Sequence, residues 1–167
     1  MSMIGNLLRV KSNELESYIH NSELLEERID NETGPELLDI DKTWEGILYI
    51  LTGYGLSNLE LAKPPLKWVI IGDNIVDENQ DLGYGPAEFR TPDQVKEISS
   101  ALELISDIEF RTMFQNSDIS MREDIYPGIL WPEAEDAFHY HFEYFKLIKE
   151  FYAIAAKNNE AVISFIN

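Results

Sequence analysis

The chain has 167 residues, of which 44% are hydrophobic and 11% aromatic, and its 31 acidic against 13 basic residues give a formal net charge of −18. This length and apolar content suit one domain that spans residues 1–167. A surface of this charge repels nucleic-acid phosphates and anionic lipid headgroups, so we expect no nucleic acid and no membrane as a partner. The acidity fits either simple solubility or a basic protein partner.

Cysteine is absent from the sequence. Its absence excludes disulfides, thiolate catalysis and cysteine-ligated zinc or iron–sulfur sites. The start of the chain lacks the basic stretch and the apolar length of a signal peptide, and nowhere do about eighteen apolar residues follow one another. We therefore expect a cytoplasmic protein.

The first half of the chain is predicted to form a strand followed by two helices. Residues 4–10 are a short β-compatible run, and an Asn-x-x-Glu capping box opens the helix after it. The acidic residues 23–36 predict a surface loop, because the stretch ends near a Gly-Pro pair that breaks regular structure. The next helix is predicted from Asp41, since apolar residues recur there at helical spacing until Thr52-Gly53.

The second half is predicted to be mostly helical. Residues 66–71 follow a stiff Lys-Pro-Pro link and predict a short helix, whereas residues 73–85 predict a polar loop. The Thr91-Pro92-Asp93-Gln94 segment is a strong helix start, and a Ser-x-x-Glu box opens a further helix behind it. Residues 133–157 predict a long core-facing helix, and residues 161–166 predict a buried strand beside the first one.

This order of elements predicts an α/β fold of the α+β type. Helices should pack around a small mixed β-sheet that holds both the N-terminal and the C-terminal strand. No linker, repeat or low-complexity segment divides the chain. We therefore expect one helix-rich, compact domain.

The sharpest chemical pattern is a run of oxygen donors at Asp77, Asn79 and Asp81, followed by Glu88. Their spacing matches the first, third, fifth and last ligand positions of an EF-hand calcium loop. The match breaks at Leu82, where that loop requires glycine for its sharp turn. A solvated acidic loop is therefore the main interpretation, and a divalent-cation site is the alternative.

The histidines and the glycine loops are interpreted as structural. His139 and His141 cannot share a metal on a helix, because each residue turns the chain by about 100°. His141 falls on the apolar stripe and is predicted to be a hydrogen-bonded core residue, whereas His139 is predicted to lie on the surface. Gly53-Tyr54-Gly55 and Gly83-Tyr84-Gly85 lack the neighbours of a phosphate-binding loop and are predicted to be turns.

Two carboxylates bracket an apolar residue at Asp39-Ile40-Asp41, where a helix is predicted to start. Such a pair suits acid–base catalysis or cation binding. The structural alternative is that Asp41 caps the helix and Asp39 interacts with the helix dipole. The sequence shows no G-x-S-x-G or other nucleophile motif, so no complete catalytic set is visible, and an enzyme is the less favoured interpretation.

Two stretches carry a family resemblance: Leu38-Asp39-Ile40-Asp41-Lys42-Thr43-Trp44, and Gly83-Tyr84-Gly85-Pro86-Ala87 leading into Thr91-Pro92. The Met3-Ile4-Gly5 opening and the Tyr126-Pro127 pair agree with them. Together they resemble the YfbM-like bacterial family, a domain of unknown function numbered 1877, over nearly the whole chain. The resemblance implies a compact α/β domain and no established activity. Relatives often carry histidine at Leu48 and arginine at Glu88, which argues against a catalytic scheme at either position.

The two motif segments concentrate polar and aromatic residues, and we predict that these residues line a cleft. The candidates are Asp39, Asp41, Lys42, Trp44, Tyr84 and Arg90. Trp44 is interpreted as a core residue rather than a stacking platform, because a tryptophan at helical spacing is more often buried.

Three functional hypotheses follow. The first is a non-catalytic binding or interaction protein, such as an immunity-like protein that covers a basic partner. The second is a small-molecule-binding domain or enzyme that uses the Asp39/Asp41 region. The third is the calcium loop at residues 77–88. No cofactor is predicted, and the sequence does not predict an oligomeric state.

Overall fold

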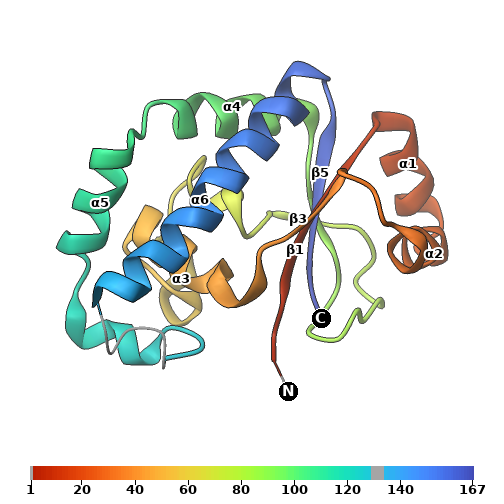
Figure 1. Cartoon of the computed structure of the whole chain (residues 1–167). Helices are drawn as coiled ribbons and strands as arrows, with labels where there is room; N and C mark the ends of the chain where they lie inside the picture. The colour runs from red at the N-terminus through yellow and green to blue at the C-terminus, as the bar shows by residue number, and fades with distance from the viewer. Residues whose placement is uncertain (1, 129–133) are drawn as a thin grey trace.

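The computed structural model describes residues 2–128 and 134–167, and it confirms the predicted α/β class of the α+β type (Figure 1). One sheet has the strand order β2-β1-β5-β4-β3. Its strands are β1 (Gly5–Val10), β2 (Leu37–Asp39), β3 (Asn74–Ile75), β4 (Glu88–Arg90) and β5 (Ala161–Ile166). The α-helices are α1 (Ser12–His20), α2 (Glu23–Asn31), α3 (Trp44–Thr52), α4 (Pro92–Glu103), α5 (Asp107–Asn116) and α6 (Ala134–Lys157). Short 3-10 helices connect them: η1 (Asp41–Thr43), η2 (Leu56–Leu61), η3 (Lys67–Val69) and η4 (Ile119–Asp124).

The centre of the sheet joins the two ends of the chain. β1 pairs with β5 along its full length, with Gly5 opposite Ile166, which confirms that the first and last strands share one sheet. Every described pairing is antiparallel, so the expectation of a mixed sheet was wrong. The reason is the route through α4 to α6, which returns the chain to the end of the sheet where β4 stops. There Arg90 lies opposite Val162, near the start of β5.

Helices cover both faces of the sheet. α1 and α2 lie on one side of it, and α3 to α6 lie on the other (Figure 1). The smaller core joins Leu15 and Leu25 of the first two helices to Leu8 of β1. The larger core joins the remaining helices to Leu7, whose side chain points to the opposite face because strand side chains alternate.

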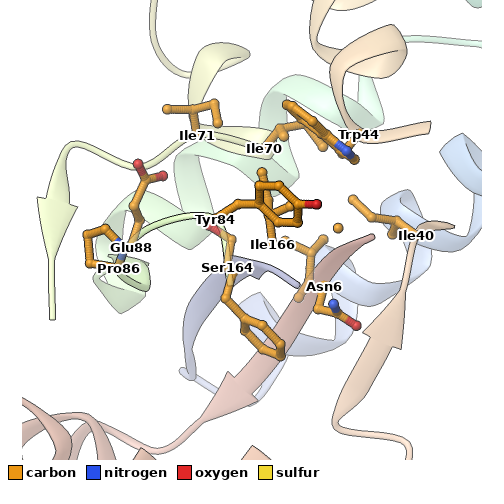
Figure 2. Close-up of a pocket in the computed structure, with 13 residues that line it drawn as sticks. Asn6, Ile40, Trp44, Ile70, Ile71, Tyr84, Pro86, Glu88, Ser164 and Ile166 are labelled. Atoms are coloured by element: carbon orange, nitrogen blue, oxygen red, sulfur yellow. The ribbon is translucent and has the colours of Figure 1, made fainter. Parts of the chain in front are cut away.

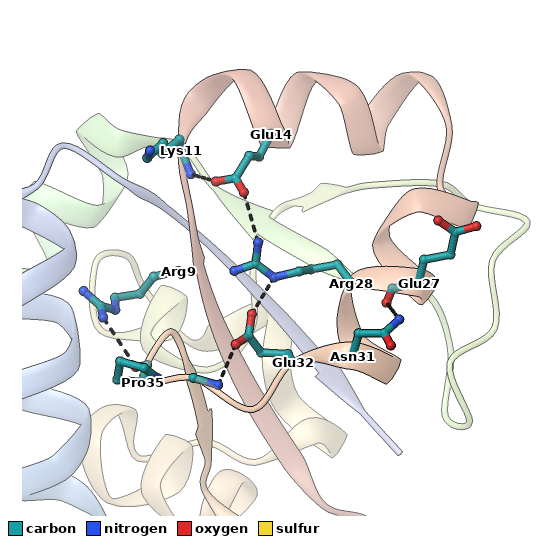
Figure 3. Close-up of polar contacts among 9 residues, drawn as sticks. Arg9, Lys11, Glu14, Glu27, Arg28, Asn31, Glu32 and Pro35 are labelled. Atoms are coloured by element: carbon teal, nitrogen blue, oxygen red, sulfur yellow. Dashed lines mark hydrogen bonds and ion pairs between the residues drawn. The ribbon is translucent and has the colours of Figure 1, made fainter.

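The acidic stretch that we expected to be a surface loop contains α2. Its charges obscured a short apolar stripe: Leu25 is fully buried, and Ile29, one helical turn later, packs against the same core. Arg28 forms ion pairs with Glu14 of α1 at 3.1 Å and with Glu32 at 2.5 Å (Figure 3). The loop prediction was wrong because two apolar positions are enough to stabilise a short helix when a strand and another helix cover them.

Capping signals predicted the starts of α4 and α5 correctly. The Gln94 N–H donates to the Thr91 hydroxyl at 3.3 Å, and the Gln94 side chain accepts from the Thr91 N–H at 3.0 Å. Ser106 and Glu109 form the same reciprocal pair at the start of α5. The predicted helix at residues 66–71 is the short η3, and β3 lies inside the predicted loop because it pairs with β4.

The long helix and the final strand are confirmed. α6 runs for 24 residues, and β5 follows it with nearly all its side chains buried. Residue 133 and the Trp131-Pro132 pair, where we predicted the start of the helix, lie outside the described residues. In the described part of the chain, no helix combines the length and apolar character that crossing a membrane requires.

Candidate functional site

A cavity of about 60 Å³ lies over the sheet, at the end where β1 begins and β5 finishes. Figure 2 shows its lining, with Trp44 and Ile40 at one end, Glu88 and Pro86 at the other, and the Tyr84 ring between them. Its apolar walls are formed chiefly by Ile40, Trp44, Ile70, Ile71, Pro86 and Ile166. Asn6, Tyr84, Glu88 and Ser164 contribute polar groups.

The floor of the cavity is built from three neighbouring strands. Ser164 of β5 lies between Leu7 of β1 and Glu88 of β4, so these three residues share one face of the sheet. Gly5 lets the start of α3 approach this face, because a Cβ at Gly5 would lie 2.8 Å from the Trp44 Cβ. The strand register therefore brings together side chains that are far apart in the sequence.

Glu88 is the only carboxylate among the residues that line the described cavity. Its Oε2 accepts a hydrogen bond from the Gly72 N–H at 2.7 Å, and its Oε1 accepts none from any described residue. Burial raises the pKa of Glu88, although the positive charge of nearby Arg90 and the Gly72 hydrogen bond oppose that shift. A Cβ at Gly72 would lie 3.0 Å from the Phe89 carbonyl oxygen, so glycine permits this close contact.

Arg90 lies beside the floor, fully buried, and does not line the cavity. Its Nε donates to the Trp68 carbonyl at 2.7 Å and its Nη1 donates to the Ser164 hydroxyl at 2.6 Å. The Ser164 oxygen is thus an acceptor from Arg90, which leaves its own O–H free to donate. Among the described residues, Arg90 Nη2 has no hydrogen-bond partner.

Tyr84 covers the cavity from a tight turn. The Gly83 and Gly85 on either side of it have φ angles of 126° and 103°, which L side chains rarely adopt, so the predicted turn is confirmed. Asp81 accepts hydrogen bonds from both glycine N–H groups, and the Tyr84 N–H donates to the Ile166 carbonyl at 3.2 Å. Tyr84 is 43% exposed, so the residue remains partly open to solvent although its turn is anchored to β5.

Trp44 is a core residue, as the sequence predicts, and it also borders the cavity. It is only 1% exposed and belongs to the large core. Its Nε1 donates to the Met3 carbonyl at 3.2 Å, and its ring stacks on Tyr126 with centroids 5.7 Å apart. These contacts fix its orientation, so Trp44 is a rigid wall.

The other members of the predicted cleft lie apart from the cavity lining. Asp39 accepts from the Asp41 N–H at 2.7 Å, and Asp41 accepts from the Tyr140 hydroxyl at 2.5 Å. Burial and the hydrogen bond to Asp41 raise the pKa of Tyr140. Lys42 is half-buried and takes part in none of the ion pairs between described residues. The structure thus places Trp44 and Tyr84 at one cavity, with Arg90 beside its floor.

The oxygen donors of the possible calcium loop do not converge. Asp77 accepts from the Asn79 N–H at 2.9 Å and from the Ser22 hydroxyl at 2.7 Å, while Asp81 holds the Tyr84 turn. Glu88 lies at the cavity on β4. Within residues 2–128 and 134–167, no group of three or more His, Asp or Glu side chains is arranged to hold a metal ion.

The histidines lie where the sequence predicted. His141 is fully buried, and its Nδ1 donates to the Ala137 carbonyl at 2.7 Å. Burial lowers the pKa of His141 to about 4. His139 is exposed and lies 3.2 Å from Glu135.

Sequence reasoning missed the polar floor of the cavity. From the sequence, Ser164 is predicted only as part of a buried strand, and Glu88 only as a calcium ligand or as a position where relatives carry arginine. One signal was available: Ser164 is the single hydroxyl-bearing residue in the otherwise apolar run Ala161–Ile166. A polar group in a buried strand requires a partner, and here that partner is Arg90.

Comparisons with known proteins agree on one family. The sequence profile of the family described as "Domain of unknown function (DUF1877)" matches residues 1–165. Protein YfbM of Escherichia coli strain K12 is 27% identical over 136 residues, which is 80% of this chain and 78% of that protein. The crystal structure of Escherichia coli YfbM, described as a protein of unknown function, matches with a TM-score of 0.74. That match covers 98% of this chain and 99% of the other at 18% identity, which shows a shared fold.

Proposed function

Because the chain belongs to the DUF1877 family of YfbM-like proteins, whose function is unknown, we propose its role from its cavity: a non-catalytic domain that binds a small ligand between the sheet and Tyr84. The observation that carries this proposal is the Glu88 carboxylate. One of its oxygens accepts no hydrogen bond from a described residue, although the group lies in a largely apolar cavity. This oxygen is not among the fully buried side-chain atoms that lack a partner, so it is accessible, and a ligand donor that enters the cavity can bind it.

The cavity residues support binding better than catalysis. Ser164 could act as a nucleophile only with a base in hydrogen-bond reach, and no histidine lines the described cavity. The Ser164 oxygen is held by Arg90, and no hydrogen bond joins Ser164 to Glu88 in the described residues. The Asp39/Asp41 pair supports an enzyme less well, because both carboxylates are engaged by the chain itself.

A fragment screen followed by NMR tests the proposal. Small polar fragments are added to the full chain, and amide and indole shifts are mapped. We expect the largest shifts at the amides of Gly72 and Ser164 and at the Trp44 indole, because Ser164 and Trp44 line the cavity and the Gly72 N–H donates to Glu88. If fragments that bind the protein leave all three signals unchanged, the cavity is not the binding site.

A second candidate role is binding to a basic protein, and the net charge of −18 favours it. Helix α2 adds exposed carboxylates at Glu23, Glu26, Glu27 and Asp30. Pull-downs from native cells at low and high salt test this role. We expect a partner at low salt that is lost at high salt, because counter-ions screen exposed charges, and that is also lost with the Glu27→Lys, Asp30→Lys double variant. Recovery of no protein partner at either salt concentration would contradict it.

A further inference from the structure

We propose that the ligand of this cavity is an organic cation, a protonated amine carried on a short alkyl chain. This inference rests on the proposed binding function and adds the chemical class of the ligand. It is drawn from three features: the Glu88 oxygen that accepts no hydrogen bond from a described residue, the lack of a described ion pair between Glu88 and the nearby cations, and the apolar walls that lead away from Glu88.

Two cations lie near Glu88, Arg90 and Lys67, and neither forms a described ion pair with it. Arg90 donates to the Trp68 carbonyl and to Ser164, and no ion pair joins it to Glu88 within the described residues. Lys67 is paired with Asp73 at 2.5 Å. Both cations lower the pKa of Glu88 by electrostatic attraction at a distance, without a described hydrogen bond to it. A ligand ammonium would place a positive charge and N–H donors in direct contact with the Glu88 carboxylate.

The walls of the cavity beyond Glu88 are mostly apolar or aromatic. Beyond Glu88 the cavity is bounded by the Tyr84 ring and by Ile70, and it ends at Trp44 and Ile40 (Figure 2). These groups offer no charge, but they can pack against methylene groups, and an aromatic ring face also attracts a cation. A ligand with a charged head at Glu88 and an apolar chain towards Trp44 satisfies both ends.

The size of the cavity limits the length of the ligand. The two ends of the cavity lie over β4 and β1, which flank β5, so they are separated by two strand spacings, roughly 10 Å. The volume of about 60 Å³ has room for a few water molecules or a short chain. A four-carbon alkylamine fits this span. The same chemistry occurs on a free amine and on a lysine side chain of a polypeptide, and the acidic surface attracts both.

The geometry also disfavours other classes of ligand. A carboxylate would approach the like charge of Glu88, and the donors of Arg90 are not exposed in the cavity. A neutral alcohol would form a hydrogen bond but would not neutralise the Glu88 charge. We therefore expect the order amine, then alcohol, then carboxylate in affinity.

Isothermal titration calorimetry of the full chain at pH 7 with n-butylamine, 1-butanol and butyrate tests this order. The amine should bind at least about tenfold more tightly than the other two, as expected for a hydrogen bond to a charged group. Glu88→Gln keeps an oxygen acceptor for Gly72 and should weaken amine binding by about tenfold to a hundredfold. The matched control is Glu150→Gln on the exposed face of α6, which should bind like the unsubstituted chain.

The outcomes separate this inference from the binding function itself. Tighter binding of butyrate or butanol than of the amine, with shifts at the Trp44 indole, would overturn the amine proposal and leave the binding function intact. Equal amine affinity in Glu88→Gln would also overturn it. If none of these compounds nor any fragment shifts the cavity signals, both proposals fail. A lysine peptide, compared with free n-butylamine and with the same peptide carrying norleucine, shows which source of the amine binds more tightly.

Discussion

Two glutamates of this protein, Glu45, which is buried, and Glu88, which is half-buried, differ in how their carboxylates are bonded. Glu45 at the start of α3 is 5% exposed, and each of its oxygens accepts a backbone N–H: Leu56 at 2.8 Å and Tyr126 at 2.9 Å. Glu88 has one such bond, from Gly72, and its other oxygen accepts none from a described residue. Glu45 is therefore committed to the fold, whereas Glu88 retains binding capacity towards the cavity.

The difference shows how a structural carboxylate can be distinguished from one available to a ligand. Acidic residues are abundant in this chain, and most of those singled out from the sequence resemble Glu45 in that the chain satisfies them locally. Asp41 accepts from Tyr140, and Asp81 accepts from two backbone N–H groups. An acceptor atom left unused is thus a better indicator of a site than the number or spacing of carboxylates.

The largest effect is expected at Glu45. Glu45→Ala leaves the N–H groups of Leu56 and Tyr126 without their buried acceptor, and we expect a loss of about 4 kcal/mol in the free energy of unfolding. Urea denaturation monitored by circular dichroism measures it. The exposed control Glu150→Ala should change stability by less than about 0.5 kcal/mol. A loss of unfolding free energy in Glu45→Ala no larger than in the control would contradict the claim that Glu45 is committed to the fold.

The next effect concerns His141, which packs against α3 so closely that a Cβ at Gly46 would lie 2.1 Å from its Nε2. Burial lowers the pKa of His141 from 6.5 to about 4, so the unfolded chain takes up the proton first as the pH falls. The stability from this group is present above pH 6.5 and decreases by about 3 kcal/mol as the pH falls to 4.

Unfolding free energies of the unsubstituted chain and of His141→Gln between pH 7 and pH 4 measure this contribution. The difference between the two proteins should diminish towards pH 4. A difference that stays constant over that range would show that the histidine is not held neutral in the folded state.

A smaller effect is expected at the Asp39/Asp41 turn. Tyr140→Phe removes the hydrogen bond to Asp41 and should cost about 1 kcal/mol. The same variant should leave amine binding unchanged, because Tyr140 does not line the cavity. Thermal denaturation and calorimetry on one sample test both statements. A variant that loses amine binding while keeping its stability would place the site at this turn instead.

The smallest effect on stability is expected at Glu88, with a pH dependence opposite to that of His141. Burial raises the pKa of Glu88, so its contribution to stability is present below the ordinary value of 4.5 and is lost as the pH rises through the folded-state pKa. Glu88→Gln should therefore be slightly more stable than the unsubstituted chain at pH 7, and that advantage should disappear below pH 4.5. Lower stability of the variant at pH 7 would mean that Glu88 resembles Glu45.

Local signals in the sequence predicted much of the fold. The Thr91 and Ser106 capping boxes, the buried His141 and the strand at residues 161–166 were all found from patterns a few residues long. α2 was missed because its apolar stripe is only two residues and lies among charges. Such a stripe is stable only through tertiary contacts, which no local pattern reveals.

The candidate site was only partly predictable. The motif segments led to Trp44 and Tyr84, which line the cavity, but also to Asp39 and Asp41, which do not. Glu88 and Ser164 meet across two strands, and their pairing depends on the register of the sheet rather than on sequence spacing. The sequence contained both residues without any signal that they are neighbours.

The most direct test of the central claim is the pKa of Glu88 itself. The carboxyl carbon of Glu88 can be followed by ¹³C NMR as the pH is varied, with and without saturating n-butylamine, which remains protonated throughout. In the free protein we expect a pKa above the ordinary value of 4.5, and with the amine we expect it to fall, because a contacting ammonium stabilises the carboxylate. A Glu88 pKa at or below 4.5 that does not change with the amine would contradict the claim that this carboxylate is open to a cationic ligand.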